Sequence, residues 1–206
     1  TFDNIEITGG SVVNVNNGIA ITLTNGLHND GFWNLVGSSG STSDQVLVFS
    51  GSQTISGQGE IVLNDDADNF IRPVLDSETL TLGPDQTIRG AGTLLADIGS
   101  LTNLGTIIAE GINALIIDPD GLGSFTNAGT LKAEGTGGLQ FNAGLFVNTG
   151  QNIEVLNDSR LVTLSGSILR NGSISSTGSG QIVPLGGTTF DNIEITGGSV
   201  VNVNNG

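Results

Sequence analysis

The chain contains no cysteine, methionine or tyrosine, and only five of its 206 residues are lysine or arginine. Without cysteine there is no disulfide framework and no thiol chemistry. Twenty acidic residues against these five bases give a formal net charge of −15. Such a charge repels phosphate backbones and anionic membrane surfaces, so we expect no nucleic-acid partner. The longest aliphatic run, 114–117, is too short to cross a bilayer, and we expect no membrane insertion in this segment.

Short strands and turns dominate what the sequence does contain. Hydrophobic residues make up 36%, mostly Ile, Leu and Val, which excludes a disordered tail. Gly, Asn, Asp and Ser interrupt them throughout, as between short strands. No window of about eleven residues has the apolar spacing of an amphipathic helix. The composition therefore predicts an all-β protein.

Alternation of apolar and polar residues identifies the strands, for example in Ile5-Glu6-Ile7 and Leu80-Thr81-Leu82. Alternation places one face of each strand in a core. The residues predicted to point inward are Ile21, Leu23, Val48, Leu82, Ile117, Phe141 and Val155.

A shorter pattern, apolar-x-Asn-x-Gly, recurs along the chain, as at 101–105, 125–129 and 146–150. Its spacing of roughly 20–25 residues is typical of a solenoid, in which stacked coils bury what one coil cannot. Stacked asparagines can bond amide to amide between coils, so we expect the amides of Asn127 and Asn148 to meet. The predicted turn ladder consists of Asn4, Asn29, Asn103, Asn127, Asn148 and Asn171.

The middle of the chain is less regular. A related form with glycine in place of asparagine occurs as QTISGQG at 53–59 and QTIRGAG at 86–92. The long interval from Gly57 to Gly90 predicts a loop bulging from one coil. The interval from Gly90 to Asn103 is too short for a coil, so either one alignment is out of phase or the motif lies on another face.

We therefore predict an all-β fold, an uncapped parallel β-helix (β-solenoid) with about eight coils in 188 residues. The number 188 comes from the ends of the chain. The eighteen residues TFDNIEITGGSVVNVNNG occupy both 1–18 and 189–206 without a substitution. Residues 1–188 are then one full repeat and 189–206 begin the next, whether the copies are natural or engineered.

The two identical stretches carry further expectations. We predict that 189–206 adopt the backbone of 1–18, displaced along one axis by a full period. Neither stretch resembles the polar cap that a solenoid ordinarily needs. We therefore expect neighbouring identical repeats to continue the chain end to end, or another copy to pair with its ends, with lateral fibre association as a further option.

Three strings resemble a known family. SLTNLGTIIAEG (100–111), SFTNAGTLKAEG (124–135) and QTIRGAGTL (86–94) are similar to the β-helical passenger repeats of filamentous-haemagglutinin-like and autotransporter adhesins. The resemblance covers nearly the whole chain and is specific for fold. It implies a secreted, right-handed parallel β-helix at the bacterial cell surface, and it brings no catalytic motif.

Individual residues give weaker signals for chemistry. His28, the single histidine, lies near Asp30 and could serve a Ser–His–Asp triad, but its outward slot favours a solvated side chain. Trp33 could stack on a sugar ring, although burial is the favoured interpretation.

Acidic clusters are the only candidate metal sites. Asp65, Asp66 and Asp68 form the densest cluster, and Asp118 with Asp120 forms a second. Oxygen-rich loops suit Ca²⁺, although solvated turns are the favoured interpretation. Paired aspartates could also act on a glycosidic bond, but the Gly-His-Gly and Arg-x-Lys strings of β-helical polysaccharide hydrolases are absent.

The sequence thus favours a structural repeat of a long extracellular filament or stalk, without catalysis or an obligatory cofactor. Two alternatives stay open: an adhesin whose loops bind a glycan or receptor, and a β-helical polysaccharide lyase or hydrolase. Fold alone does not separate the first two.

Overall fold

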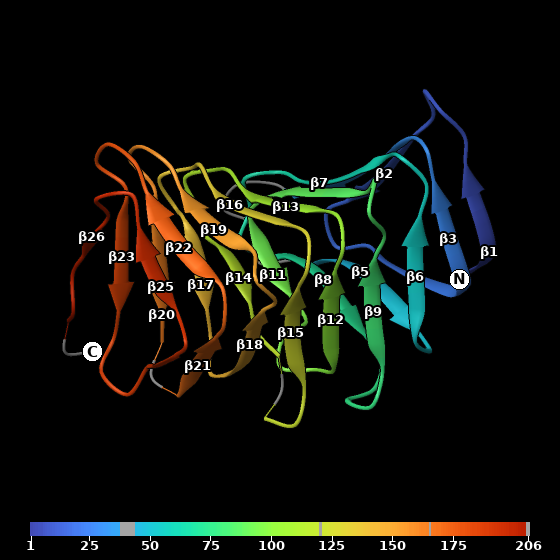
Figure 1. The fold of residues 1–206 in the computed structure, drawn as a ribbon. Helices are drawn as coiled ribbons and strands as arrows, with labels where there is room; N and C mark the ends of the chain where they lie inside the picture. The colour runs from blue at the N-terminus through green and yellow to red at the C-terminus, as the bar shows by residue number, and fades with distance from the viewer. Residues whose placement is uncertain (38–43, 120, 165, 205–206) are drawn as a thin grey trace.

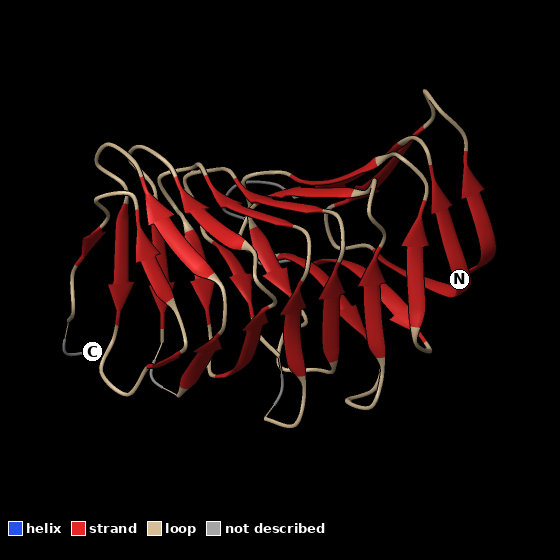
Figure 2. Cartoon of the chain, in the orientation of Figure 1, coloured by secondary structure: helices blue, strands red, loops and turns tan. Residues whose placement is uncertain are grey.

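The computed structural model describes residues 1–37, 44–119, 121–164 and 166–204, and within them every regular element is a β-strand (Figure 2). All strand pairings are parallel. The chain winds through nine coils from the N-terminus at one end to the C-terminus at the other (Figure 1). The predicted parallel β-solenoid is therefore confirmed.

Each coil contributes one strand to each of three faces, here called A, B and C. β1 (Phe2–Ile7) and β3 (Ala20–Asn29) each run round a corner from face C to face A. Face A continues with β6 (Gln53–Ser56), β9 (Thr79–Leu82), β12 (Ser100–Asn103), β15 (Ser124–Asn127), β18 (Gly144–Asn148), β21 (Ser167–Arg170) and β24 (Thr189–Asp191). Face B consists of β2 (Val12–Asn16), β4 (Phe32–Val36), β7 (Glu60–Leu63), β10 (Thr87–Gly90), β13 (Thr106–Ala109), β16 (Thr130–Ala133), β19 (Asn152–Val155), β22 (Ser173–Ser176) and β25 (Glu194–Thr196). Face C continues with β5 (Gln45–Ser50), β8 (Asn69–Pro73), β11 (Gly92–Leu94), β14 (Leu115–Ile117), β17 (Leu139–Phe141), β20 (Arg160–Thr163), β23 (Gln181–Pro184) and β26 (Val200–Val201).

One continuous hydrophobic core fills the inside of the coils. Most strands bury every second residue, which is what the sequence alternation predicts. Six of the seven predicted inward residues point into this core, one of them partly buried: Ile21, Leu23, Leu82, Ile117, Phe141 and Val155. A single coil could not bury these side chains, so the coils stabilise one another.

Val48 is the exception, and its prediction was wrong. Its neighbours Leu47 and Phe49 are fully buried, whereas Val48 lies on the outer side of β5 and is only half-buried. The register explains the difference, because Phe49 stacks directly on Leu23 of the preceding coil. β5 is apolar in both phases of its alternation, so the sequence alone leaves its inward side undecided.

The middle of the chain is also more regular than predicted. The segment from Gly57 to Gly90 contains β7, β8 and β9 in ordinary coils rather than a bulging loop. The two QTI motifs lie on different faces, the first in β6 on face A and the second in β10 on face B. This difference of face accounts for the short interval between Gly90 and Asn103.

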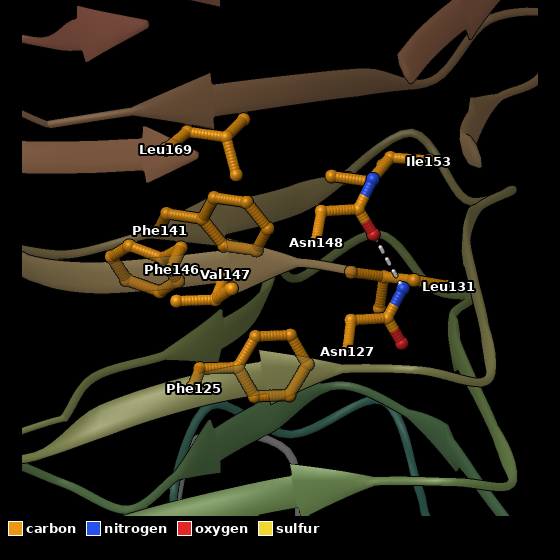
Figure 3. A pocket seen from close by; sticks show the side chains of 9 residues that line it. All are labelled: Phe125, Asn127, Leu131, Phe141, Phe146, Val147, Asn148, Ile153 and Leu169. Atoms are coloured by element: carbon orange, nitrogen blue, oxygen red, sulfur yellow. Dashed lines mark hydrogen bonds between the residues drawn. The ribbon is translucent and has the colours of Figure 1, made fainter. Parts of the chain in front are cut away.

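Three phenylalanines form the most aromatic part of the core (Figure 3). The rings of Phe141 and Phe146 are stacked, with centroids 4.3 Å apart and an interplanar angle of 13°. Phe125 is tilted against both, at 6.3 Å from each. The space between these rings and their neighbours has no room for a water molecule. This region is therefore packed core rather than a ligand pocket.

Several of the few basic residues connect successive coils on the outer surface. Arg89 lies between Glu60 and Glu110 of the coils on either side, at 2.8 and 2.5 Å. Lys132 pairs with Glu154 at 3.2 Å. These ion pairs are partly exposed, so each contributes at most about 1 kcal/mol. They place positive charge beside carboxylates of neighbouring coils in a chain with a net charge of −15.

Candidate functional site: polar ladders and the repeated end coils

Buried asparagines form a ladder at the corner between faces A and B. Asn103 donates from Nδ2 to Asn127 Oδ1 at 2.7 Å, and Asn127 donates in turn to Asn148 Oδ1 at 2.8 Å (Figure 3). Asn148 ends the ladder by donating to the carbonyl of Gln151. The three side chains are 1% exposed or less. The predicted stacking of Asn127 on Asn148 is confirmed.

Replacing Asn127 by Leu is expected to lower the free energy of unfolding by about 1–3 kcal/mol, because it leaves Asn103 Nδ2 and Asn148 Oδ1 buried without their partner. Equilibrium urea unfolding measures the change. The control is Asn14→Leu, which removes a similar bond to Asn34 at an exposed site. Equal losses in both variants would contradict a special role for burial.

Three predicted members are not part of this hydrogen-bonded ladder, although Asn171 follows Asn148 in register because Arg170 stands opposite Val147. Asn4 is exposed with a φ of 47°, and Asn171 has a φ of 63° and accepts a bond from Asn192 at 3.1 Å. Asparagine tolerates this left-handed conformation better than most residues. Asn29 is fully buried but lies two residues beyond the register position of Asn103. The assignment of these three residues to one ladder was therefore wrong.

Asn29 belongs to a second buried arrangement that the sequence did not reveal. Its Nδ2 donates to Gln86 Oε1 at 3.2 Å, and Gln86 Nε2 donates back to the Asn29 carbonyl at 2.6 Å. The bond spans two coils, and the intervening coil has glycines at 57 and 59. A Cβ on Gly59 would lie 2.7 Å from Asn29 Nδ2. A Cβ on Gly57, the glycine that replaces asparagine in the QTISGQG string, would lie 2.3 Å from the Asn29 carbonyl oxygen that accepts from Gln86, so both glycines leave room for this pairing.

Glu78 closes another corner and was also missed by the sequence analysis. Its buried carboxylate accepts the backbone N–H groups of Gly51, Val74 and Leu75 at 2.8 to 3.0 Å. Nothing in the pattern marks a lone Glu before a strand as a cap. Buried polar side chains of several types therefore satisfy the backbone wherever the coil turns.

His28 takes part in an exposed network that spans two coils. Its Nδ1 lies 3.0 Å from Ser56 Oγ, and its Nε2 lies 3.1 Å from Asp30 Oδ2. A hydrogen bond from the Gln58 backbone, with a smaller contribution from His28, lowers the pKa of Asp30 below its usual range. The order of groups is that of a Ser–His–Asp triad. The strand that carries Ser56, β6, is paired with β3 on one side and with β9 on the other.

The first acidic cluster is engaged with the backbone. Asp65 Oδ1 accepts the N–H groups of Ile112 and Asn113 at 3.0 and 2.8 Å, two coils further on. Asp66 is buried and accepts the N–H of Asp68 at 3.1 Å. Across the described ranges, His, Asp and Glu side chains form no group of three that could hold a metal ion.

Of the second acidic pair, Asp118 is described, whereas Asp120 lies outside the described residues. Burial raises the pKa of Asp118 above its usual value, and the nearby Asp97 adds to this. A raised carboxyl pKa favours the protonated folded state, so this contribution to stability is present at low pH and lost as pH rises through the folded-state pKa.

We therefore expect Asp118→Asn to raise the melting temperature near about pH 7 and to change it little near about pH 3. Thermal unfolding followed by circular dichroism at both pH values measures the difference. Asp76→Asn, at an exposed position, is the matched control. A larger gain at the lower pH would contradict the assigned cause.

Trp33 is fully buried under face B and meets the ring of Phe2 edge-on, at 6.2 Å between centroids. It therefore exposes no ring on which a sugar could stack, and the hypothesis of ligand stacking was wrong. Its burial agrees with the interpretation favoured by the sequence.

The first copy of the repeated stretch, residues 1–18, lies beneath the second coil. Its strands pair with β3 and β4. Asp3 Oδ1 accepts bonds from Thr24 Oγ1 at 3.1 Å and from Asn25 Nδ2 at 2.6 Å. Glu6 stands opposite His28. This copy is thus engaged on the side that faces the rest of the chain.

The second copy, residues 189–206, is engaged on the opposite side. Its described strands pair with β21, β22 and β23 of the preceding coil. Asp191 pairs with Arg170 at 2.8 Å. The side occupied in the first copy is exposed here: Val203 is 76% exposed, whereas its counterpart Val15 is fully buried.

The two copies do not occupy the same faces. Ile5 to Ile7 lie on face A, whereas the corresponding residues of the second copy lie on face B in β25. The local backbone is alike, since Asn4 and Asn192 have φ values of 47° and 55°. The predicted displacement along the axis alone was wrong, because 188 residues take the chain through eight coils and one further face.

Within the described ranges, no helix is long and apolar enough to cross a membrane. No protein-family model, curated protein or solved structure matches this chain.

Proposed function

We propose that this chain is a segment of a structural filament or stalk, in which 188-residue β-solenoid repeats follow one another end to end. The observation that carries the proposal is the pair of identical stretches. One copy shows which coil follows the stretch, and the other shows which coil precedes it. Together they specify both neighbours of the stretch, so one repeat fits on the next without a new contact type.

The architecture supports a mechanical role. Its hydrogen bonds between coils run along the solenoid axis, and buried asparagines and outer ion pairs add side-chain links in the same direction. A parallel stack advances about 4.8 Å per coil, so each repeat would add roughly 40 Å to the length of the fibre. A solenoid lengthens without changing its cross-section.

The proposed location is the outside of a bacterial cell. It rests on the resemblance of the 100–111 and 124–135 strings to adhesin passenger repeats. The proposed partners are neighbouring identical repeats.

Electron microscopy of the native protein tests the proposal. We expect unbranched fibres of constant width, whose length corresponds to roughly 40 Å per 188 residues of the native polypeptide. Intact-mass measurement of the same sample gives the number of repeats. A native polypeptide with a single copy of the unit, or a compact particle in place of a fibre, would overturn the proposal.

A further inference from the structure

A buried carboxylate lies at the corner between faces B and C, in the loop that joins β7 to β8. Asp66 is only 8% exposed. Its Oδ1 accepts the backbone N–H of Asp68 at 3.1 Å, whereas its Oδ2 is fully covered and has no hydrogen-bond partner within the described ranges. None of the ion pairs in the same ranges involves Asp66. Because buried carboxylates are ordinarily paired or bound to a metal, this oxygen lacks a positive partner.

The oxygen of a second buried side chain lies beside it. A Cβ on Gly37, just after β4, would lie 2.3 Å from Asp66 Oδ2 and 2.4 Å from Gln45 Oε1. The two oxygens therefore flank the same point. Gln45 is fully buried and directs its Nε2 to Asn17 Oδ1 at 2.8 Å. It thus presents oxygen, and not nitrogen, to the carboxylate.

A third buried oxygen belongs to the same corner. Asn69 stands directly opposite Gln45 in the register of β5 and β8. Its Nδ2 donates to the carbonyl oxygens of Asn64 and Asp66 at 2.8 and 3.1 Å, whereas its Oδ1 is covered and has no donor in the described part of the chain. The side chains of this corner therefore use their N–H groups elsewhere and leave oxygens without donors.

We propose that this corner binds Ca²⁺, with Asp66 Oδ2 as the charged ligand and Gln45 Oε1 and Asn69 Oδ1 as neutral ligands. A set of carboxylate and amide oxygens suits a hard cation, and water completes the coordination of Ca²⁺ in such sites. Asp65 and Asp68 add negative charge in the same loop, which attracts a cation. The site uses one acidic ligand, so it differs from a cluster of three carboxylates. It lies within a single repeat and does not depend on the proposed filament.

Two substitutions in the full chain test the site. Asp66→Asn keeps the shape of the side chain and its Oδ1 but removes the charged ligand. Asp65→Asn is the matched control, because it removes the same charge one residue away, from a carboxylate that accepts the N–H groups of Ile112 and Asn113 instead. Isothermal titration calorimetry of chelator-treated protein with CaCl₂, at neutral pH and physiological salt, measures the affinity.

We expect the wild type and Asp65→Asn to bind one Ca²⁺ with similar affinity. Asp66→Asn should lose at least about 10–100-fold, the loss that even outer-shell partners of a metal cause. Thermal unfolding gives a second readout with a change of sign. In chelator, Asp66→Asn should melt above the wild type, because it removes a buried charge without a partner. In saturating CaCl₂, the wild type should melt above Asp66→Asn, because the ion binds only its folded state tightly.

Absence of Ca²⁺ binding to the wild type would overturn the proposal and leave water as the partner of these oxygens. Equal losses in both variants would show diffuse attraction by the acidic loop, and unchanged binding by Asp66→Asn would place the ion elsewhere; both overturn the site. If Asp66→Asn does not fold, Gln45→Glu takes its place. A second carboxylate beside Asp66 should tighten Ca²⁺ binding, since affinity rises with the number of charged ligands. Weaker binding by Gln45→Glu would contradict the assigned ligands.

Discussion

Replacing Phe141 by Ala is expected to lower the free energy of unfolding by about 3–5 kcal/mol. Its ring is fully buried and stacked on Phe146 at 4.3 Å, and Phe125 lies 6.3 Å from both rings. Removing the ring takes apolar surface out of the core and leaves a cavity. The backbone of β17 cannot move in to close this cavity, because β17 is hydrogen-bonded to β14 on one side and to β20 on the other. Urea unfolding measures the change.

Phe32→Ala is the control, since this ring is 40% exposed on the outer side of face B. Its loss should stay below about 1 kcal/mol. If Phe141→Ala does not fold, Phe141→Leu keeps the test available with a smaller void. A loss at Phe141 no larger than that at Phe32 would contradict the continuous core described above.

Replacing Gly90 by Ala is expected to have the second largest effect. Gly90 ends β10 with a φ of 121°, a conformation that costs other residues about 1–3 kcal/mol. A Cβ there would also overlap the carbonyl oxygen of Leu63 in the preceding coil. The backbone would have to move apart at the corner between faces B and C, so we expect a loss above the cost of strain alone.

Gly10→Ala separates the two causes. Gly10 has a φ of 81°, and a Cβ there would meet nothing within 4 Å. This variant should therefore show the conformational strain without the overlap. Urea midpoints with unchanged m values give the comparison. A Gly10→Ala loss equal to that of Gly90→Ala would show that coil spacing at Gly90 is not the limiting contact.

Much of the fold follows from local features of the sequence. Alternation placed Leu23 and Phe141 correctly, because each has a polar neighbour on both sides, which leaves one phase of the strand for the core. Val48 failed because β5 is apolar in both phases, and only Phe49 stacking on Leu23 decides between them. Inward direction is thus predictable where polarity alternates and undecided where it does not.

The ladders show the other limit of prediction. Asn127 and Asn148 were placed correctly by their common motif and spacing. The pairing of Asn29 with Gln86 depends on a contact across two coils, and no local pattern encodes it. Asn171 follows Asn148 in register, yet its backbone is left-handed and its side chain bonds with Asn192. Residue type and register therefore do not determine the role of an asparagine when its backbone conformation differs.

The single extra face between the two copies of the repeated stretch has a consequence for how such stalks would sit side by side. In an array, the outer surface of each repeat would be rotated by one face relative to the repeat before it. An apolar or charged surface patch would therefore return to the same side only after three repeats. Two parallel stalks could then match along isolated patches but never along their full length. A β-rich surface that would otherwise invite sheet-like aggregation is in this way interrupted at intervals. The repeat length itself would keep neighbouring fibres apart.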